Sequence, residues 1–368
     1  MDRQITFSVA LSDQRSSYST PGKSVWDSEG EQSAFPFLAY QDRIGKFSFA
    51  VGTAVTHSYG HEFEDDDFPG RFLATGMTFE AREHVLGVAY QLPSKISVGV
   101  GIRSVQADMN WSRRRLGAFD IGLDQPQLYE VREGFDGSDS ATGFSFGLQY
   151  YKSRRLNFGL AYQSPVSLSF SGDHSFLQLT QTQIPAAAQR FGQQFQDGRF
   201  TSDFDLPAKI SAGFTTRVTI RTRLELDVDW EDWSRIEQQR FDRETGSVVV
   251  DRQFRDVATF RVAGDFQQKK ALLWRLALAS SRSIADQNAI EPSFPDADRF
   301  HYSFGVSYTF EKLTLEAAYQ YVQYRDRQVS DQEQLISLEE PDYLYDTLQN
   351  GLYETQRHYL NLGVRYRF

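Results

Sequence analysis

The stretch HYLNLGVRYRF, residues 358–368, alternates apolar with polar or small side chains along its whole length. A β-strand sends successive side chains to opposite faces, so this stretch has one apolar face and one polar face. Its apolar set is Leu360, Leu362, Val364, Tyr366 and Phe368. An exposed terminal strand of this kind invites aggregation in a soluble protein, whereas a membrane barrel needs its last strand to pair with its first. The stretch therefore predicts a strand that closes a transmembrane barrel.

The same two-residue alternation recurs along the chain. The alternating segments are 5–11, 34–40, 47–55, 86–92, 96–102, 144–150, 156–162, 204–214, 224–230, 260–266, 272–278, 302–310, 313–321 and 358–368. They give about fourteen strands, and the connections between them are alternately short and long, as is typical of outer-membrane barrels with short periplasmic turns and long extracellular loops. We therefore predict an all-β fold, a transmembrane antiparallel β-barrel of about 14 strands. We expect it to form a single domain over residues 1–368.

The composition agrees with a membrane barrel and argues against several other classes of protein. The chain has 368 residues, of which 24% are charged, a balance that a barrel allows because only alternate residues face lipid. No stretch reaches the ~18 consecutive apolar residues that a membrane helix needs. There is no cysteine, which removes disulfides, thiolate nucleophiles and cysteine-bound metals. The net charge of -10 argues against binding to nucleic acid, which needs a basic face.

Charged side chains of both signs fall on the parity opposite to the apolar one, which should face the barrel lumen. These residues are Arg103, Glu225, Asp227, Asp229, Arg261, Asp265, Arg275, Glu316, Arg365 and Arg367. A basic side chain facing lipid would cost ~2–4 kcal/mol at mid-membrane, so the lumen is the favoured side. We expect cross-strand ladders that hold the barrel and its water in place, and a direct substrate role for single residues stays open.

Two long segments, 112–140 and 172–202, carry many apolar residues although they should lie outside the membrane. The candidate residues for a binding groove are Leu116, Phe119, Leu128, Phe176, Leu177, Leu179, Phe191 and Phe195. Water-facing loops expose such groups when they pack together or bind something. An apolar groove is therefore predicted here, with self-packing of the two loops as an equal alternative. A short helix is expected around 184–191, because Pro185 suits a helix start.

Motifs for catalysis or metal binding are weak in this sequence. Residues 143–147 match G-x-S-x-G, but they sit inside an alternating strand rather than at the strand-to-helix elbow that the motif requires. The six histidines are scattered, and none belongs to an H-E-x-x-H pattern. We therefore predict no catalytic residue, no cofactor and no metal site.

Four stretches, taken in order, resemble the long-chain fatty acid transporter family of the outer membrane (FadL type), including its aromatic-hydrocarbon branch. They are FDLPAKISAG (204–213), LDVDWEDWS (226–234), FRVAG (260–264) and PDADRF (295–300). The pairs Tyr59-Gly60 and Gly70-Arg71 fit the same template, and the resemblance covers residues 5–368. The final segment, with Tyr366 and Phe368, resembles the C-terminal signal that the barrel-assembly machinery of Gram-negative bacteria reads.

The resemblance implies a fourteen-stranded barrel, surrounded by outer-membrane lipid and lipopolysaccharide, whose third strand kinks inward to open a lateral exit. In this chain the kink would fall at Ser58, Tyr59 and Gly60, since glycine tolerates irregular backbone. The alternative, that Gly60 simply begins a loop, stays open. The family also has an N-terminal hatch before strand one, and this chain starts at strand one. Either the hatch is missing from the sequence given, or the protein works without one, and gating and the openness of the lumen stay undecided.

These features favour a passive, monomeric transporter that takes up hydrophobic small molecules, long-chain fatty acids or related lipids and hydrocarbons, with lateral exit through the barrel wall. One alternative is a general diffusion porin for polar solutes, which would have a water-filled bore without an apolar groove. Another is an outer-membrane hydrolase, which would need a serine and a histidine within hydrogen-bonding range.

Overall fold

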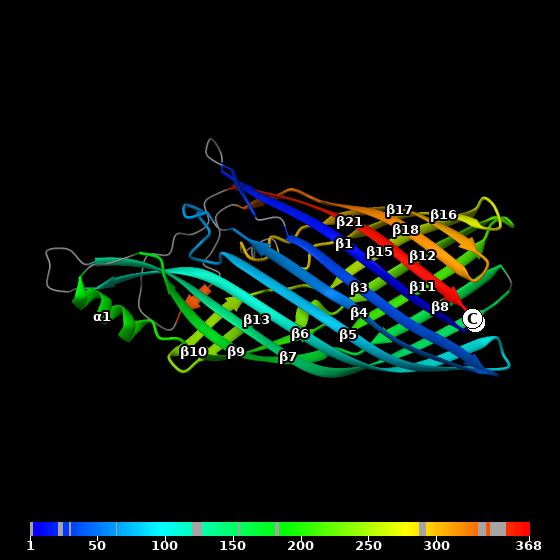
Figure 1. Ribbon diagram of the computed structural model, residues 1–368, viewed down its shortest axis with the longest axis horizontal. Coiled ribbons are helices and arrows are strands. Elements are labelled where there is room, and N and C mark those ends of the chain that lie inside the picture. The colour runs from blue at the N-terminus through cyan, green and yellow to red at the C-terminus, as the bar shows by residue number, and fades with distance from the viewer. Residues whose placement is uncertain are drawn as a thin grey trace.

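The computed structural model describes residues 3–20, 25–28, 31–63, 65–119, 127–153, 155–180, 184–286, 292–329, 336–338 and 351–368. In this part of the chain, fourteen strands close into one antiparallel barrel, which confirms the predicted fold (Figure 1). In order around the wall they are β1 (Gln4–Ser19), β3 (Glu31–Ile44), β4 (Phe47–Glu62), β5 (Gly76–Gln91), β6 (Ile96–Phe119), β7 (Gln127–Tyr151), β8 (Leu156–Gln163), β11 (Lys209–Arg217), β12 (Thr222–Glu231), β15 (Val257–Gln267), β16 (Leu272–Ser281), β17 (Arg299–Phe310), β18 (Leu313–Tyr324) and β21 (Gly351–Arg367).

The barrel closes where β1 pairs with β21, the strand built on the alternating stretch at 358–368. Sixteen residue pairs join the two strands, from Gln4 opposite Arg367 to Ser19 opposite Leu352. Closure matters because lipid offers no hydrogen-bonding partner to an open strand edge. Neighbouring strands meet at tight turns at one end, and Gly45 between β3 and β4 has a φ of 63°, which glycine adopts without strain.

Large apolar side chains cover the outside of the barrel as a continuous band. They include Phe7, Phe49, Leu86, Ile102, Phe144, Leu160, Leu226, Phe260, Leu276, Phe304, Leu315 and Leu362, all of which are exposed. Soluble proteins rarely expose apolar patches of this size, whereas a lipid-facing wall requires them. Among the residues described, no helix is both long enough and apolar enough to cross a membrane.

Beyond this band the strands continue at the end opposite to the short turns and to the C-terminus (Figure 1). The extension contains β9 (Val166–Gln178), β10 (Gly198–Leu206), β13 (Gln238–Arg243), β14 (Gly246–Asp251) and α1 (Pro185–Gln194). Short pieces β2 (Val25–Asp27), β19 (Arg327–Val329) and β20 (Ile336–Leu338) complete it, and the 3-10 turn η1 (Trp233–Arg235) follows β12.

Two predicted loops are therefore largely strand, which corrects the sequence reading of 112–140 and 172–202. β6 and β7 form a hairpin that reaches Phe119 and Gln127, and β9 and β10 flank the predicted helix, found as α1. The segment read as one strand over 204–214 is two strands, because Pro207 has no N–H to donate to a ladder. The alternation at 127–140 was missed because Glu133 occupies a position on its apolar face.

Glu133 holds the outer extension together through a buried ion cluster. Its carboxylate accepts hydrogen bonds from Arg113 Nε at 2.7 Å and Arg243 Nη1 at 2.6 Å, and His174 Nε2 lies 3.0 Å away. Burial alone would raise the pKa of Glu133, but Arg113, the hydrogen bond from His174, Arg115 and Arg243 hold this pKa well below its usual range. The cluster links β6, β7, β9 and β13 beyond the membrane band.

We expect the stability of the outer extension to fall as the pH drops below the ordinary glutamate pKa of about 4.3. A depressed folded-state pKa means that the unfolded chain binds more protons in this range, so acid favours unfolding. Glu133→Gln should remove this dependence and destabilise the extension by about 3–5 kcal/mol, because buried guanidinium groups lose their counter-charge. Denaturant unfolding at several pH values measures both effects. Asp173→Asn, which breaks an exposed ion pair with Arg199, is the matched control. If unfolding of Glu133→Gln depended on pH as it does in the wild type, the role of the cluster would be contradicted.

Leu276 on the outer face of β16 is 63% exposed and tests the lipid-facing assignment. Leu276→Arg should lower the free energy of unfolding by about 2–4 kcal/mol, because a basic side chain is costly in hydrocarbon. Thr215→Arg places the same side chain on the lumen face of β11 and should be much milder. Denaturant unfolding of barrels reconstituted in vesicles compares the two, and equal losses would show that the faces are misassigned.

Candidate functional site

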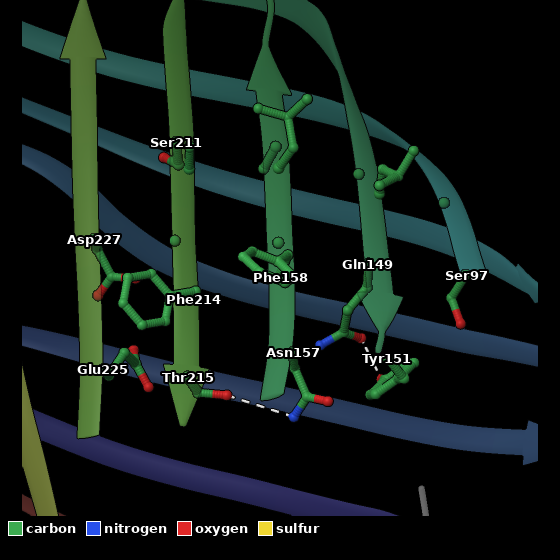
Figure 2. Close-up of a pocket in the computed structure, with 18 of the residues that line it drawn as sticks. Ser97, Gln149, Tyr151, Asn157, Phe158, Ser211, Phe214, Thr215, Glu225 and Asp227 are labelled. Atoms are coloured by element: carbon green, nitrogen blue, oxygen red, sulfur yellow. Dashed lines mark hydrogen bonds between the residues drawn. The ribbon is translucent and has the colours of Figure 1, made fainter. Parts of the chain in front are cut away.

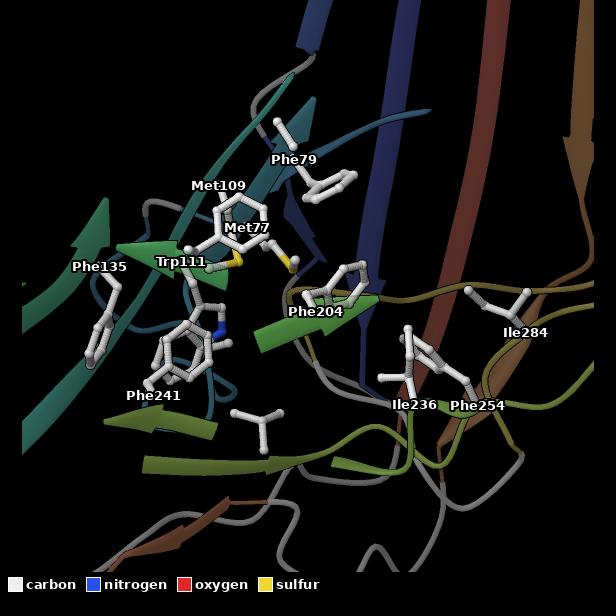
Figure 3. Close-up of a cluster of buried hydrophobic side chains, with 14 of the residues drawn as sticks. Met77, Phe79, Met109, Trp111, Phe135, Phe204, Ile236, Phe241, Phe254 and Ile284 are labelled. Carbon is white, nitrogen blue, oxygen red and sulfur yellow. The ribbon is translucent and has the colours of Figure 1, made fainter. Parts of the chain in front are cut away.

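The outer half of the barrel interior is filled with apolar side chains. Figure 3 shows Met77 and Met109 close to Trp111, with Phe241 beside it. The rings of Trp111 and Phe241 stack with their centroids 5.0 Å apart. The same buried cluster includes Phe79, Phe135, Phe170, Phe200, Phe204, Trp233 and Phe254. In this half the described residues offer an apolar environment rather than a water-filled bore.

The half near the short turns is polar and contains a cavity of about 850 Å³. Its charged lining residues are Arg223, Glu225, Asp227, Asp229 and Arg261. Figure 2 shows Glu225 and Asp227 on one strand beside Ser211 and Thr215 on the next. A Cβ at Gly213 would lie 2.1 Å from Oδ1 of Asp227, so glycine is what lets this carboxylate cross the neighbouring strand.

Cross-strand ion pairs join the charged residues that the sequence assigns to the lumen. Nη2 of Arg261 lies 3.6 Å from Oδ2 of Asp229, and Nη1 of Arg261 lies 4.0 Å from Oδ2 of Asp227. Arg275 lies 3.4 Å from Glu316, which also accepts a hydrogen bond from Arg365 on β21 at 2.8 Å. Such pairs keep both signs of charge satisfied inside the wall, whatever solute the lumen contains.

A buried ion pair marks the change from the polar to the apolar half. Arg103 on β6 donates two hydrogen bonds of 2.8 Å to the carboxylate of Glu83 on β5, and both side chains are almost fully buried. Arg103 also donates to the carbonyl of Ser164 at 2.9 Å, where the chain passes from β8 to β9. Beyond Arg103, the inward-facing residues of β6 are Val105, Ala107, Met109 and Trp111.

A second cavity, of about 510 Å³, lies against β4 and is the candidate functional site. Its aromatic lining residues are Phe35, Tyr59, Phe79, Phe204, Trp233, Phe254, Phe294, Tyr324 and Tyr359. The rings of Tyr59 and Phe294 lie 4.4 Å apart, and those of Phe254 and Phe294 lie 5.3 Å apart. The cavity thus combines an aromatic wall with polar and charged side chains such as Glu231, Asp296 and Arg299, and apolar surface with polar groups at fixed places is usual in a small-molecule site.

The pairing of the barrel wall is interrupted beside this cavity. β4 pairs with β3 only as far as Ala54, whereas its pairing with β5 continues to Glu62. A register shift between Val55 and His57 gives β4 one extra residue, Thr56. A β-bulge of this kind bends its strand and ends pairing on one side. β3 meanwhile stays paired with β1, so the two neighbouring strands separate beyond the bulge.

The irregularity of β4 therefore lies at Thr56 and not at Ser58, Tyr59 and Gly60, where the sequence predicts the kink. Those three residues pair in register with β5. Glycine suggested the position, but a bulge needs an additional residue and not a glycine. Ser58 and Tyr59 do line the cavity. Because Thr56 is left out of the ladder, Tyr59 lies opposite inward-facing Phe79; if all residues of β4 were paired in sequence, Tyr59 would share the lipid-facing parity of Val51.

Side chains from β1 and β21 contact the backbone of β4 where β3 no longer pairs with it. Gln14 Nε2 donates to the carbonyl of Gly60 at 3.4 Å. Arg357 donates to the carbonyl of Ser58 at 3.4 Å and to Oγ of Ser12 at 3.2 Å. These contacts supply partners to a strand edge that would otherwise be unpaired inside the barrel.

The predicted groove residues come together only in part. Phe176, Phe191 and Phe195 pack with Tyr129 and Val131 in a small cluster beside α1. The ring centroids of Phe191 and Phe195 lie 5.0 Å apart, and Phe195 is buried. Self-packing, one of the two alternatives drawn from the sequence, therefore occurs among these residues.

Of the other five candidates, Leu177 and Leu179 do not join this cluster. Leu177 on β9 is exposed, and Leu179 follows the same strand half-buried. Leu116, Phe119 and Leu128 belong to β6 and β7 by their backbone pairing, but their side chains lie outside the described residues.

The aromatic cavity was missed from the sequence, although parity contains a signal for it. On β5, Leu86 and Val88 face lipid, whereas Met77 and Phe79 share the opposite parity and face inward. Apolar residues at the lumen-facing positions of a strand, confined to its outer part, therefore indicate an apolar barrel interior at that end.

The described residues give no support to catalysis at the G-x-S-x-G match. Ser145 lies within β7, paired with Gly101 and Gln163, and no strand-to-helix elbow exposes it. Within the same residues, no group of three His, Asp or Glu side chains is placed to hold a metal ion.

Comparisons with known proteins give a consistent picture. The family model described as outer membrane protein transport protein (OMPP1/FadL/TodX) matches residues 3–368. A long-chain fatty acid transport protein of Salmonella typhi is 23% identical over 288 residues, covering 72% of this chain and 64% of that protein. A 47 kDa outer membrane protein of Pasteurella multocida (strain Pm70) is 27% identical over 281 residues, covering 71% and 63%. The chain thus spans just under two thirds of the length of these relatives.

Solved structures share the barrel. A FadL homologue of Pseudomonas aeruginosa superposes with a TM-score of 0.84 at 17% identity, covering 100% of this chain and 90% of that chain. The P. putida toluene transporter TodX superposes with a TM-score of 0.72 at 13% identity, with the same coverage. These identities establish the fold alone. Because the family model matches nearly the whole chain, this protein is a β-barrel of the bacterial outer membrane that belongs to the OMPP1/FadL/TodX family of outer membrane transport proteins.

Proposed function

We propose that this protein takes up hydrophobic small molecules passively, and that long-chain fatty acids, related lipids or hydrocarbons are the substrate class. The observation that supports this best is the aromatic cavity of about 510 Å³ beside the separation of β4 from β3. The names of similar proteins, a long-chain fatty acid transport protein and a toluene transporter, agree with an apolar substrate. The driving force is removal of apolar surface from water, ~25 cal/mol per Å².

Capture begins at the outer end, where apolar groups lie beside α1. Phe176, Phe191 and Phe195 form one wall of the proposed entry, with Tyr129 beneath them. The remaining groove candidates, Leu116, Phe119, Leu128, Leu177 and Leu179, extend the same surface in this proposal. From here the apolar interior of the outer half leads down to the cavity, so the ligand stays out of water along its route.

Exit follows the wall rather than the axis of the barrel. The lower lumen is lined by charged residues such as Asp227 and Arg261, which an apolar ligand would have to desolvate. The β3–β4 separation lies at the height of the lipid-facing band, because β3 there pairs with the part of β1 that contains exposed Leu11. A ligand leaving the cavity sideways therefore meets hydrocarbon.

A general porin for polar solutes is less well supported. The polar cavity of about 850 Å³ would suit water and ions. However, the apolar cluster around Trp111 and Phe241 occupies the outer half of the lumen within the described residues. A polar solute would lose its hydration there without replacement hydrogen bonds.

Assembly and surroundings follow from the same proposal. Tyr366 and Phe368 are exposed on the outer face beside the short turns, with their ring centroids 5.0 Å apart. This position suits a signal read by the barrel-assembly machinery. We expect a monomer surrounded by outer-membrane lipid and lipopolysaccharide.

Deleting Thr56 tests the lateral exit. The deletion removes the bulge, restores an uninterrupted β4–β5 register and keeps Tyr59 on the lumen side, so β4 should continue its pairing with β3. Uptake of radiolabelled palmitate by cells should then fall towards the level of cells without the protein. Thr56→Ala keeps the bulge length and should retain uptake. A folded deletion variant with wild-type uptake would refute the lateral route.

Phe191→Asp tests capture at the outer cluster. A charge among Phe176, Phe195 and Tyr129 should weaken ligand entry, so half-maximal uptake should need a higher palmitate concentration while the maximal rate is kept. Gln189→Asp introduces the same charge at an exposed position of the same helix. If both variants behave alike, the cluster has no part in capture.

A further inference from the structure

We propose that Arg357 makes the cavity at the β3–β4 separation selective for amphiphiles with an anionic head group, such as a carboxylate. Arg357 lies on β21, is 6% exposed and lines the cavity. Among the residues that the structure describes, its buried Nε–H has no hydrogen-bond partner and its guanidinium has no carboxylate partner. A buried cation without a counter-charge is costly, and an anionic ligand group would offset that cost.

The other three charged residues of the cavity wall each have an ion-pair partner. Glu231 lies 3.1 Å from Nζ of Lys209. Asp296 lies 2.7 Å from Nη1 of Arg299. Of the four charged residues that line the cavity, Arg357 is therefore the one without an ion-pair partner among the residues that the structure describes. This is the electrostatic requirement for recognising one negative charge.

The position of Arg357 suits a head group better than a hydrocarbon chain. Its guanidinium carbon lies 4.8 Å from the ring centroid of Tyr359 and 5.7 Å from that of Phe35, which belongs to β3 at the edge of the separation. Phe204 and Phe254 line the same cavity and offer apolar contact. An amphiphile would therefore place its chain against the aromatic wall and its head beside Arg357.

This inference rests on the proposed uptake of hydrophobic molecules and names the chemical class of the ligand. Arg357 also donates to Ser58 and Ser12, so it supports β4 whether or not it binds an anion. A test must separate the two roles. Gln14 provides the comparison, because it supports Gly60 of the same strand without carrying charge.

The experiment measures equilibrium binding of palmitate and hexadecanol, which share a chain length and differ in the head group, to the purified full chain in detergent. The wild type should bind palmitate more tightly. Arg357→Gln should weaken palmitate binding by about tenfold or more, the loss of a charge-assisted hydrogen bond, and leave hexadecanol within roughly twofold. Gln14→Leu should change both ligands alike. Equal effects of Arg357→Gln on the two ligands would overturn the proposal.

Arg357→Lys gives a second test if Arg357→Gln does not fold, which heat-modifiable migration in gels reports. The lysine keeps the positive charge but lacks the planar guanidinium group, so the preference for palmitate should persist. Loss of this preference in Arg357→Lys would overturn the proposal. A wild type that binds neither ligand would contradict the proposed function itself. A wild type that binds both equally would leave uptake standing and remove the role of Arg357.

Discussion

Backbone hydrogen bonding inside a hydrocarbon layer is the constraint on which this structure depends. Each strand must find partners on both sides, and the ladder between β1 and β21 meets that demand at the seam of the barrel. The β3–β4 ladder is an exception among the described residues, because it stops at Phe37 and Ala54 although both strands continue beyond these residues. The exception is tolerable because this part of β4 faces the interior, where Gln14 and Arg357 donate to its carbonyls.

The interior is divided by chemistry and not by a change of fold. The same strands carry charged ladders near the short turns and aromatic side chains beyond Arg103. A lumen that was polar throughout would accommodate polar solutes along its whole length, and one that was apolar throughout would accommodate apolar solutes. In the proposed route, two polarities in sequence would lead an apolar ligand to the boundary, next to the place where the wall is interrupted. Thr56 lies near that boundary, so the interruption of the wall and the change of polarity occur at the same level of the barrel.

The barrel could be predicted from sequence because alternation is a local property, repeated in every strand. Leu360, Leu362 and Val364 already show the two-residue alternation that the other strands follow. The interruption of β4 could not be predicted, because one additional residue at Thr56 leaves no compositional trace and becomes visible only when two strands are aligned. The β6–β7 hairpin could not be predicted for a different reason. Glu133 lies on its buried face, and its charge is compensated by arginines from other strands, which the sequence of one segment does not reveal.

If uptake follows the proposed lateral route, the interruption in the side wall affects the step that comes after this protein. A molecule that leaves between β3 and β4 enters the bilayer and does not reach the aqueous periplasm directly. Its onward transfer then depends on desorption from the inner leaflet, a step that becomes slower with each additional methylene because more apolar surface must be hydrated. The partitioning of the cargo, more than the width of the barrel, would thus set how fast a soluble carrier receives it.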